Sequence, residues 1–251
     1  LGAACTFNRA CVKPDQYAGD GVLGRWFWFG EQPFLKLNLK GERFCNESGP
    51  YDYMLHSTIM QPHQTYVDIW DANHAAQAEA FDEVGCCRLF PFPNGAKNNI
   101  PMQVVDGMID KLIEDGYVQK ADTMEELAEK LNLPVETTVA SWKHYNEMAA
   151  AGEDTDYYKE NHRLMAIDTP PFYASRNRCG VLVVMYGLNV NAKSQVCDQN
   201  DVPIPGLYAI GNAQGNFVTD SYPILIPGIS HGRCVTFGRL LGQALAKGET
   251  L

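Results

Sequence analysis

Apolar and polar residues alternate over positions 35–40, where a leucine stands at every second position and Lys, Asn and Lys stand between them. This period of two predicts a strand with one buried and one solvated face. The run Lys40-Gly41-Glu42 predicts the turn that follows, with residues 43–47 returning beside the strand. A second strand is predicted over residues 65–70, Thr-Tyr-Val-Asp-Ile-Trp.

Helical periodicity marks much of the middle of the chain. Asp71 is the expected N-cap of a helix that runs to about residue 84. Apolar residues then recur at helical spacing in three segments, which are residues 104–116, 122–131 and 134–152. The next segment, residues 153–162, is polar and is expected to be a surface loop.

The C-terminal region alternates short apolar runs with glycine-rich connections. Residues 181–186 and 206–212 are expected to be buried strands. A helix should begin near Gly228 and end at Gly248. Three apolar residues are expected on its inward face: Val235, Leu241 and Leu245. A strand, a small-residue loop and a helix N-terminus together favour an electron-rich ligand, because free amides and the helix dipole point toward it.

Composition excludes several classes of protein. The 251 residues carry a formal net charge of -10, which argues against a nucleic-acid groove and against binding to an anionic membrane surface. No apolar run in the sequence is long enough to span a bilayer. The eight cysteines form no CxxC pair and no Cys/His zinc spacing, so neither a metal site nor a disulfide framework is expected. The start, Leu1-Gly-Ala-Ala-Cys5, lacks a basic region and a methionine, and is expected to be the interior of a longer protein or a processed end.

Residues 19–24 match the G-x-G-x-x-G dinucleotide fingerprint. That fingerprint needs a hydrophobic strand before it and an amphipathic helix after it. Here a proline interrupts residues 12–18, and Trp26-Phe-Trp-Phe29 follows the turn directly. Phosphate binding at this turn, as in an NAD-linked dehydrogenase, is therefore kept only as an alternative.

Several ordered motifs carry a family resemblance. Near the C-terminus they are Gly206-Leu-Tyr-Ala-Ile-Gly-Asn212, Pro227-Gly-Ile-Ser-His-Gly232 and Thr236-Phe-Gly-Arg-Leu-Leu-Gly242. Together these resemble the closing segment of the fumarate reductase and ketosteroid dehydrogenase flavoproteins. The run Arg43-Phe-Cys-Asn-Glu-Ser-Gly-Pro-Tyr51 is similar to the entry to that family's cap domain, in the version nearer to the ketosteroid dehydrogenases.

The resemblance implies a fold and a cofactor. The fold is an α+β cap domain followed by the C-terminal α/β segment of an FAD-binding, glutathione-reductase-like domain. Residues 1–24 and 166–251 would belong to the FAD-binding domain, and residues 25–165 to the cap. The N-terminal segment that holds the ADP half of FAD is expected to be missing from this sequence, and whether further residues are missing near positions 22–26 stays open.

The resemblance also implies the site residues. Six residues would contact FAD, with Asn212 at the ribityl chain: Gly211, Asn212, Gly228, Ile229, Ser230 and His231. Tyr51 falls at the position of a catalytic tyrosine and is expected to act as an acid, because an unperturbed phenol has a pKa of about 10. Tyr222 falls where the family polarises a substrate carbonyl together with a backbone amide, here that of Gly228. Arg43 and Glu47 are spaced to form an ion pair, and both a catalytic proton-relay role and a structural role stay open.

The expected function is that of an FAD-dependent oxidoreductase which exchanges hydride with an alkene at the flavin N5. Leu225 stands where the dicarboxylate reductases of the family have a substrate-binding arginine. An apolar, ring-containing or otherwise activated alkene is therefore favoured over fumarate. The expected partners are this small-molecule substrate and an external electron donor. A dicarboxylate reductase and an inactive fragment remain alternatives.

Overall fold

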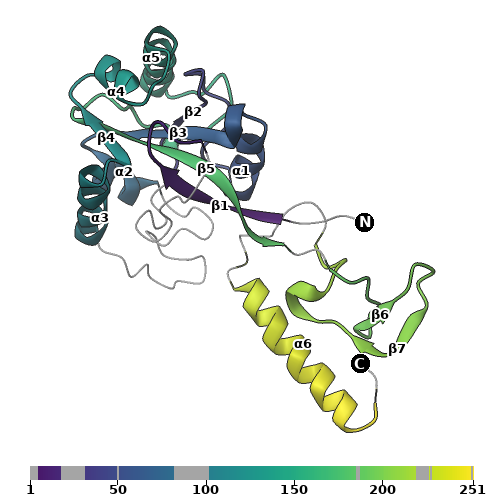
Figure 1. Cartoon of the computed structure of the whole chain (residues 1–251). Helices are drawn as coiled ribbons and strands as arrows, with labels where there is room; N and C mark the ends of the chain where they lie inside the picture. The colour runs from purple at the N-terminus through teal and green to yellow at the C-terminus, as the bar shows by residue number, and fades with distance from the viewer. Residues whose placement is uncertain are drawn as a thin grey trace. The chain divides into compact units, whose positions relative to one another are not determined.

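The strand β5 (Phe172–Val184) organises a five-stranded sheet in the order β1-β5-β3-β2, and β4 also pairs with β5 (Figure 1). The other strands are β1 (Cys5–Val12), β2 (Leu35–Leu37), β3 (Thr65–Trp70) and β4 (Val118–Ala121). The pairs β2–β3, β3–β5 and β4–β5 are antiparallel. This computed structural model describes residues 5–17, 32–49, 51–81, 102–184, 187–218, 226, 228–249 and 251.

The strands predicted near residues 35 and 65 are confirmed, but the expected solvated face of the first is wrong. Every residue of β2 and β3 is buried. Lys36 is only 1% exposed, because its Nζ lies 3.0 Å from an Asp68 carboxylate oxygen and donates to the Gln32 carbonyl at 2.7 Å. A buried cation needs such a partner, and a single strand's pattern cannot reveal a partner on another strand.

Alternate residues of these strands build two separate cores. One core includes Leu35, Ile69 and Ala174 and packs against α4 (Met124–Lys130) and α5 (Val135–Ala151). The other includes Trp70 and packs against α2 (His74–Ala80) and α3 (Met102–Glu114). Because neighbouring strand residues point to opposite faces, the sheet is covered on both sides, with α4 and α5 lying apart from α2 and α3 (Figure 1).

The helices predicted for the middle of the chain are confirmed, with one change at Asp71. Thr123 caps α4 by accepting the Glu126 amide at 3.2 Å, and Gly152 ends α5 in the left-handed conformation. Asn73, not Asp71, is the N-cap residue of α2. The Asp71 carboxylate instead accepts the amides of Asn73, Asp168 and Thr169 at 2.9–3.0 Å, so it joins α2 to the segment before β5.

The chain divides into two compact units, one of residues 8–180 and one of residues 1–7 with 181–251. The first includes α1 (Tyr51–Ile59), the short helical turns η2 (Pro62–Gln64) and η3 (Asn161–Arg163), and most of the sheet. The boundaries expected at residues 24 and 165 are functional assignments to cap and FAD domain, and they stay predictions. The boundaries between the two packing units fall elsewhere, one after residue 7 and the other after residue 180.

The second unit contains a two-stranded sheet, a helical turn and a long helix. These are β6 (Gln195–Cys197), β7 (Pro203–Tyr208), η4 (Gly211–Ala213) and α6 (Ile229–Ala246). The predicted start of the helix after Gly228 is confirmed. The expected inward face is only partly correct, since Leu241 is buried whereas Val235 is 71% and Leu245 44% exposed. The strand expected to be buried at 206–212 ends at Tyr208, and the residues of β7 are mostly exposed.

Part of the sequence prediction falls outside the described residues. The fingerprint-like turn at 19–24, the aromatic run after it, Tyr222 and Leu225 all lie there. No helix in the described part of the chain is both long enough and apolar enough to cross a membrane.

Substitution of Gly41 should destabilise the first unit. Gly41 has φ of +77°, and a Cβ there would lie 2.6 Å from the Thr138 Oγ1 and 2.9 Å from its backbone nitrogen. We expect Gly41→Ala to lower the free energy of unfolding by about 2 kcal/mol, measured by urea denaturation with tryptophan fluorescence. Gly107→Ala in α3 is the control, because nothing lies within 4 Å of a Cβ there, and it should be neutral or slightly stabilising. Equal effects of the two substitutions would contradict this packing.

Candidate functional site

The loop between β7 and α6 makes a close approach that only glycine allows. Gly211 has φ of +63°, and a Cβ at this position would lie 2.6 Å from the Cys234 Sγ of α6. A side chain would therefore be strained by the backbone and would also clash. This contact brings η4 against α6 and places Asn212 beside the first turn of the helix.

Asn212, Ser230 and Arg233 form a hydrogen-bonded cluster at this junction. The Ser230 hydroxyl donates to the Asn212 Oδ1 at 3.1 Å. The Arg233 Nη2 donates to the Gly211 carbonyl at 2.6 Å and to the same Asn212 Oδ1 at 3.2 Å. The structure thus brings together Gly211, Asn212 and Ser230, three of the six residues predicted to contact the cofactor.

Arg233 was missed by the sequence reasoning. Arg233 is only 4% exposed, and its guanidinium carbon lies 4.3 Å from the ring centroid of Phe217. The available signal was its position three residues after Ser230, which places both on one helical face. An arginine on a glycine-rich helix is otherwise expected to reach solvent, so its residue type concealed the role.

Among the described residues, none covers the N-terminus of α6. Gly228 is its N-cap residue with φ of +80°, and no described side chain caps the helix or puts a carboxylate in its first turn. A Cβ at Gly228 would meet nothing within 4 Å. The first amides of a helix lack intrahelical partners, so this end fits an electron-rich group such as the pyrimidine edge of a flavin. Ile229 and Ser230 begin the helix here, and His231 is exposed.

A second polar cluster lies inside the first unit and contains the expected Arg43–Glu47 ion pair, which is confirmed. Arg43 donates from Nε and Nη2 to the two Glu47 carboxylate oxygens, each at 2.8 Å. It also donates from Nη1 and Nη2 to Asp154 at 2.7 and 2.6 Å. Lys159 completes the cluster, with its Nζ 3.5 Å from Glu47. The positive charges of Arg43 and Lys159 therefore balance the negative charges of Glu47 and Asp154.

The segment 153–162 is largely the surface loop that its polarity predicted, but two of its residues are buried. Asp154 is 2% and Lys159 is 3% exposed. Asp154 also accepts the backbone amides of Asp156, Tyr157 and Lys159 at 2.9–3.1 Å. The Lys159 Nζ donates to the Tyr145 hydroxyl at 2.8 Å and to the Pro33 carbonyl. Polar composition correctly indicated exposure for most of the segment, but it did not indicate that Asp154 and Lys159 complete a buried charge cluster.

Burial and pairing compete in the ionisation of this cluster. Burial opposes ionisation of Glu47 and Asp154, but the opposite charges and the hydrogen bonds from Arg43 and Lys159 outweigh it, so the pKa of each carboxyl is lowered. Burial lowers the pKa of Lys159, although Glu47 opposes the shift. Burial also raises the pKa of the Tyr145 phenol well above its usual value. Both carboxylates are therefore ionised at neutral pH.

The cluster fastens the segment that leads into α1, the helix that begins at Tyr51. The Asn46 Nδ2 donates to the Tyr157 carbonyl at 3.1 Å, and its Oδ1 accepts the Ser48 amide at 2.8 Å. The Tyr157 hydroxyl donates to the Arg43 carbonyl at 3.1 Å. The backbone of Tyr51 is described as helical, whereas its side chain and the whole of Tyr222 lie outside the description.

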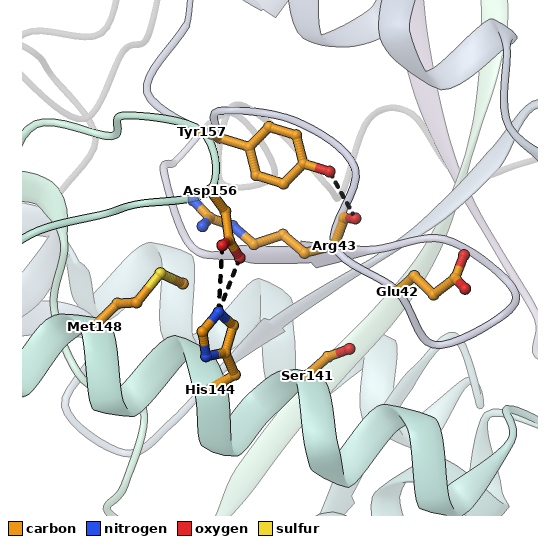
Figure 2. Close-up of a pocket in the computed structure, with 7 residues that line it drawn as sticks. All are labelled: Glu42, Arg43, Ser141, His144, Met148, Asp156 and Tyr157. Carbon is orange, nitrogen blue, oxygen red and sulfur yellow. Dashed lines mark hydrogen bonds and ion pairs between the residues drawn. The ribbon is translucent and has the colours of Figure 1, made fainter.

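A hollow of about 430 Å³ opens next to this cluster, between α5 and the loops around Glu42 and Asp156. Figure 2 shows its lining, with the His144 ring on α5 in contact with the Asp156 carboxylate, 3.2 Å away. It is lined by Glu42, Arg43, Ser141, His144, Met148, Asp156 and Tyr157. Arg43 lines the hollow but its nitrogens already donate to Glu47 and Asp154, so it has little capacity left for a ligand.

Another hollow, of about 520 Å³, lies near the end of α1. Its lining combines two aromatic rings, amides, a thiol and a guanidinium: Tyr17, Ile59, Gln61, His63, Gln64, Arg178 and Cys179. His63 and Gln64 both have positive φ, of 56° and 54°. Two adjacent non-glycine residues in this conformation store backbone strain, which is a feature of functional sites.

Loss of the Asp154 charge should destabilise the protein most at neutral pH. Its pKa is lowered in the folded state, so it contributes stability above the ordinary carboxyl pKa of about 3.9 and loses that contribution as the pH falls further. We expect Asp154→Asn to lower the free energy of unfolding by about 3 kcal/mol at pH 7, with the gap to wild type narrowing below about pH 4. Urea denaturation between pH 7 and pH 3 measures this. Asp156→Asn is the control, since it removes only a half-exposed pair with His144 and should cost under about 1 kcal/mol. A gap that is constant with pH would contradict the assigned ionisation.

Comparison with known proteins places this geometry in a family. Vinyl phenol reductase of Lactiplantibacillus plantarum is 30% identical over 223 residues, which are 87% of this chain and 44% of that protein. The 3-oxosteroid 1-dehydrogenase of Mycolicibacterium smegmatis is 28% identical over 239 residues, which are 88% of this chain and 40% of the dehydrogenase. The chain therefore spans less than half the length of these relatives.

Solved structures show the same fold. The 3-ketosteroid delta1-dehydrogenase of Sterolibacterium denitrificans aligns over 98% of this chain and 44% of its own, with a TM-score of 0.62 and 21% sequence identity. The mixed α/β arrangement is thus a partial FAD-binding domain fold. The family model described as "FAD binding domain" matches residues 29–224, well over half of the chain, and we conclude that the chain belongs to this FAD binding domain family.

Proposed function

We propose that this chain supplies the flavin-facing part of an FAD-dependent oxidoreductase that acts on a carbon–carbon double bond. The observation that carries the proposal is the junction of η4 and α6, where Gly211, Asn212 and Ser230 meet beside an uncapped helix N-terminus. The family match and the named activities of the relatives support the same chemistry.

The residues fit FAD in two respects. Asn212 would reach the ribityl chain, and the amides of Ile229 and Ser230 would face the pyrimidine edge, where a helix dipole stabilises negative charge. Gly228 leaves space in front of those amides. Bound FAD would supply hydride exchange at its N5; the protein's task is to position the substrate and to move a proton.

Tyr51 and Tyr222 are the proposed groups for that task. Tyr51 would donate a proton to the carbon next to the one that exchanges hydride. The Tyr222 hydroxyl and the Gly228 amide would donate hydrogen bonds to a carbonyl conjugated with the alkene, so that charge developing on its oxygen is stabilised.

Arg43 and Glu47 were candidates for either a catalytic or a structural role, and we propose that they act as positioning residues. The nitrogens of Arg43 already donate to two carboxylates, and Glu47 is fully buried against Arg43 and Lys159. Neither is a ready proton donor to a substrate. Their contribution would be to hold residues 43–49, and with them the start of α1.

The proposed substrate is an apolar, ring-containing or otherwise activated alkene. The relatives include a vinyl phenol reductase and a 3-oxosteroid 1-dehydrogenase, whose names point to ring-containing compounds. A dicarboxylate reductase is the alternative, supported by a 26% identical NADH:fumarate oxidoreductase of Klebsiella pneumoniae. Leu225 argues against it, because an aliphatic side chain cannot pair with a carboxylate.

Exposed apolar residues support a further expectation, that additional FAD-binding sequence completes the second unit. Leu207, Val235 and Leu245 are between 43% and 71% exposed. The pattern of α6 predicts burial on a side that the described residues leave uncovered. We propose that a segment holding the ADP half of FAD packs there in the complete protein, and that an external donor supplies electrons.

Flavin retention tests the cofactor. The complete protein containing this sequence, incubated with FAD and desalted, should keep a flavin absorbance band, and the chain alone should keep much less. Gly211→Val should abolish retention because its side chain would meet Cys234, whereas Gly107→Ala on α3, with nothing within 4 Å of its Cβ, should not. A complete protein without a flavin absorbance band would contradict the proposal.

Removal of the Tyr222 hydroxyl tests the catalytic role. In the FAD-loaded complete protein, Tyr222→Phe should lower turnover of an enone substrate by about 100-fold, the scale of a lost oxyanion donor. The flavin spectrum serves as the control for an intact cofactor site. An unchanged rate with bound flavin would refute this role for Tyr222.

A further inference from the structure

The orientation of the Asn212 amide is decided by chemistry. Arg233 carries only N–H donors and no acceptor. The Asn212 atom that lies 3.2 Å from the Arg233 Nη2 must therefore be the carbonyl oxygen and not the amide nitrogen. The Ser230 hydroxyl lies 3.1 Å from the same oxygen, so this oxygen accepts two hydrogen bonds.

Arg233 is held firmly enough to impose this orientation. It is 4% exposed, it donates to the Gly211 carbonyl at 2.6 Å, and its guanidinium lies 4.3 Å from the Phe217 ring centroid. The Gly211 carbonyl belongs to the residue before Asn212, so one guanidinium nitrogen fixes both the backbone and the side chain of this turn.

The amide nitrogen is then the group that Asn212 has left for a ligand. Within the described part of the chain, the Asn212 Nδ2 makes no hydrogen bond, and the residue is half-buried. Both lone-pair positions of Oδ1 are used by Ser230 and Arg233. Asn212 can therefore offer two N–H donors and no acceptor.

We propose that Arg233 is a positioning residue that makes Asn212 an obligate hydrogen-bond donor toward the cofactor. The proposal rests on the proposed function, because it takes FAD as the ligand. It assigns the partner of Asn212 as an acceptor oxygen of FAD, a ribityl hydroxyl oxygen or a carbonyl oxygen, and excludes a hydroxyl that donates to Asn212.

Asn212→Asp separates this proposal from the opposite hydrogen-bond direction. An aspartate has nearly the same shape, and its oxygen would gain a charge-assisted bond from Arg233. An ionised carboxylate has no N–H donor, so the FAD oxygen would lose its partner. The variant should thus have an equal or higher melting temperature and an FAD affinity that is lower by about tenfold or more.

Arg233→Met tests the positioning itself. Without the guanidinium the Asn212 amide is free to turn, so FAD affinity should fall by about tenfold, while Ser230→Ala, which leaves Arg233 in place, should have a smaller effect. Lys193→Met is the control, because Lys193 is exposed in the same unit but away from α6, and it should leave affinity unchanged.

The measurement is the dissociation constant of FAD for the deflavinated complete protein, from quenching of flavin fluorescence, together with the melting temperature of each variant. Weaker binding and unimpaired stability in Asn212→Asp support the proposal. Equal or tighter FAD binding by Asn212→Asp overturns this proposal. The proposed function still stands in that case, provided that the wild-type protein binds FAD. A wild-type protein that does not bind FAD overturns both. If Asn212→Asp lowers the melting temperature as much as Asn212→Leu does, the hydrogen bond between Arg233 and Asn212 is contradicted, whatever the FAD affinity of the variant.

Discussion

The buried ion-pair cluster of Arg43, Glu47, Asp154 and Lys159 is the constraint on which the first unit depends. It joins two segments 111 residues apart in the chain, and it does so with equal numbers of positive and negative charges. A balanced cluster avoids the large free-energy cost of an isolated buried charge, but the removal of any one member restores that cost. The turn at Gly41, the start of α1 and the C-terminal end of α5 are therefore held in one arrangement.

The second unit depends instead on two glycines, positions that have no side chain. Gly211 allows the loop to contact Cys234, and Gly228 leaves the amides of α6 open. Arg233 then fills the space between loop and helix with a fixed set of donors. A ligand with electron-rich edges finds backbone and side-chain N–H groups already oriented, so little ordering is required on binding.

Periodicity along the sequence predicted the elements whose pattern is local. Apolar spacing located α3, α4 and α5, because each of these helices packs one regular face against the core. The composition of residues 65–70 located β3, which is buried along its whole length. The Arg43–Glu47 pair was also predictable, since both partners lie in one short segment.

Features that depend on distant partners were not predictable in this way. Lys36 looked solvated because its partner Asp68 is on another strand. The burial of Asp154 and Lys159 within the surface loop 153–162 was not predicted, because their partners Arg43 and Glu47 lie far back in the sequence. Val235 and Leu245 were expected inward because their pattern is that of a core helix, yet the described residues leave them exposed. Arg233 was missed because only the fold brings it to Asn212.

Hydrogen–deuterium exchange of the complete protein, with and without FAD, tests the central claim most directly. The account predicts that FAD slows exchange at residues 210–214 and 228–234, while peptides from the hollow beside α5, around Ser141 and His144, are unchanged. Protection confined to the α5 hollow, or no protection at the Gly211–Arg233 junction when flavin is bound, would contradict the claim that this junction holds the flavin.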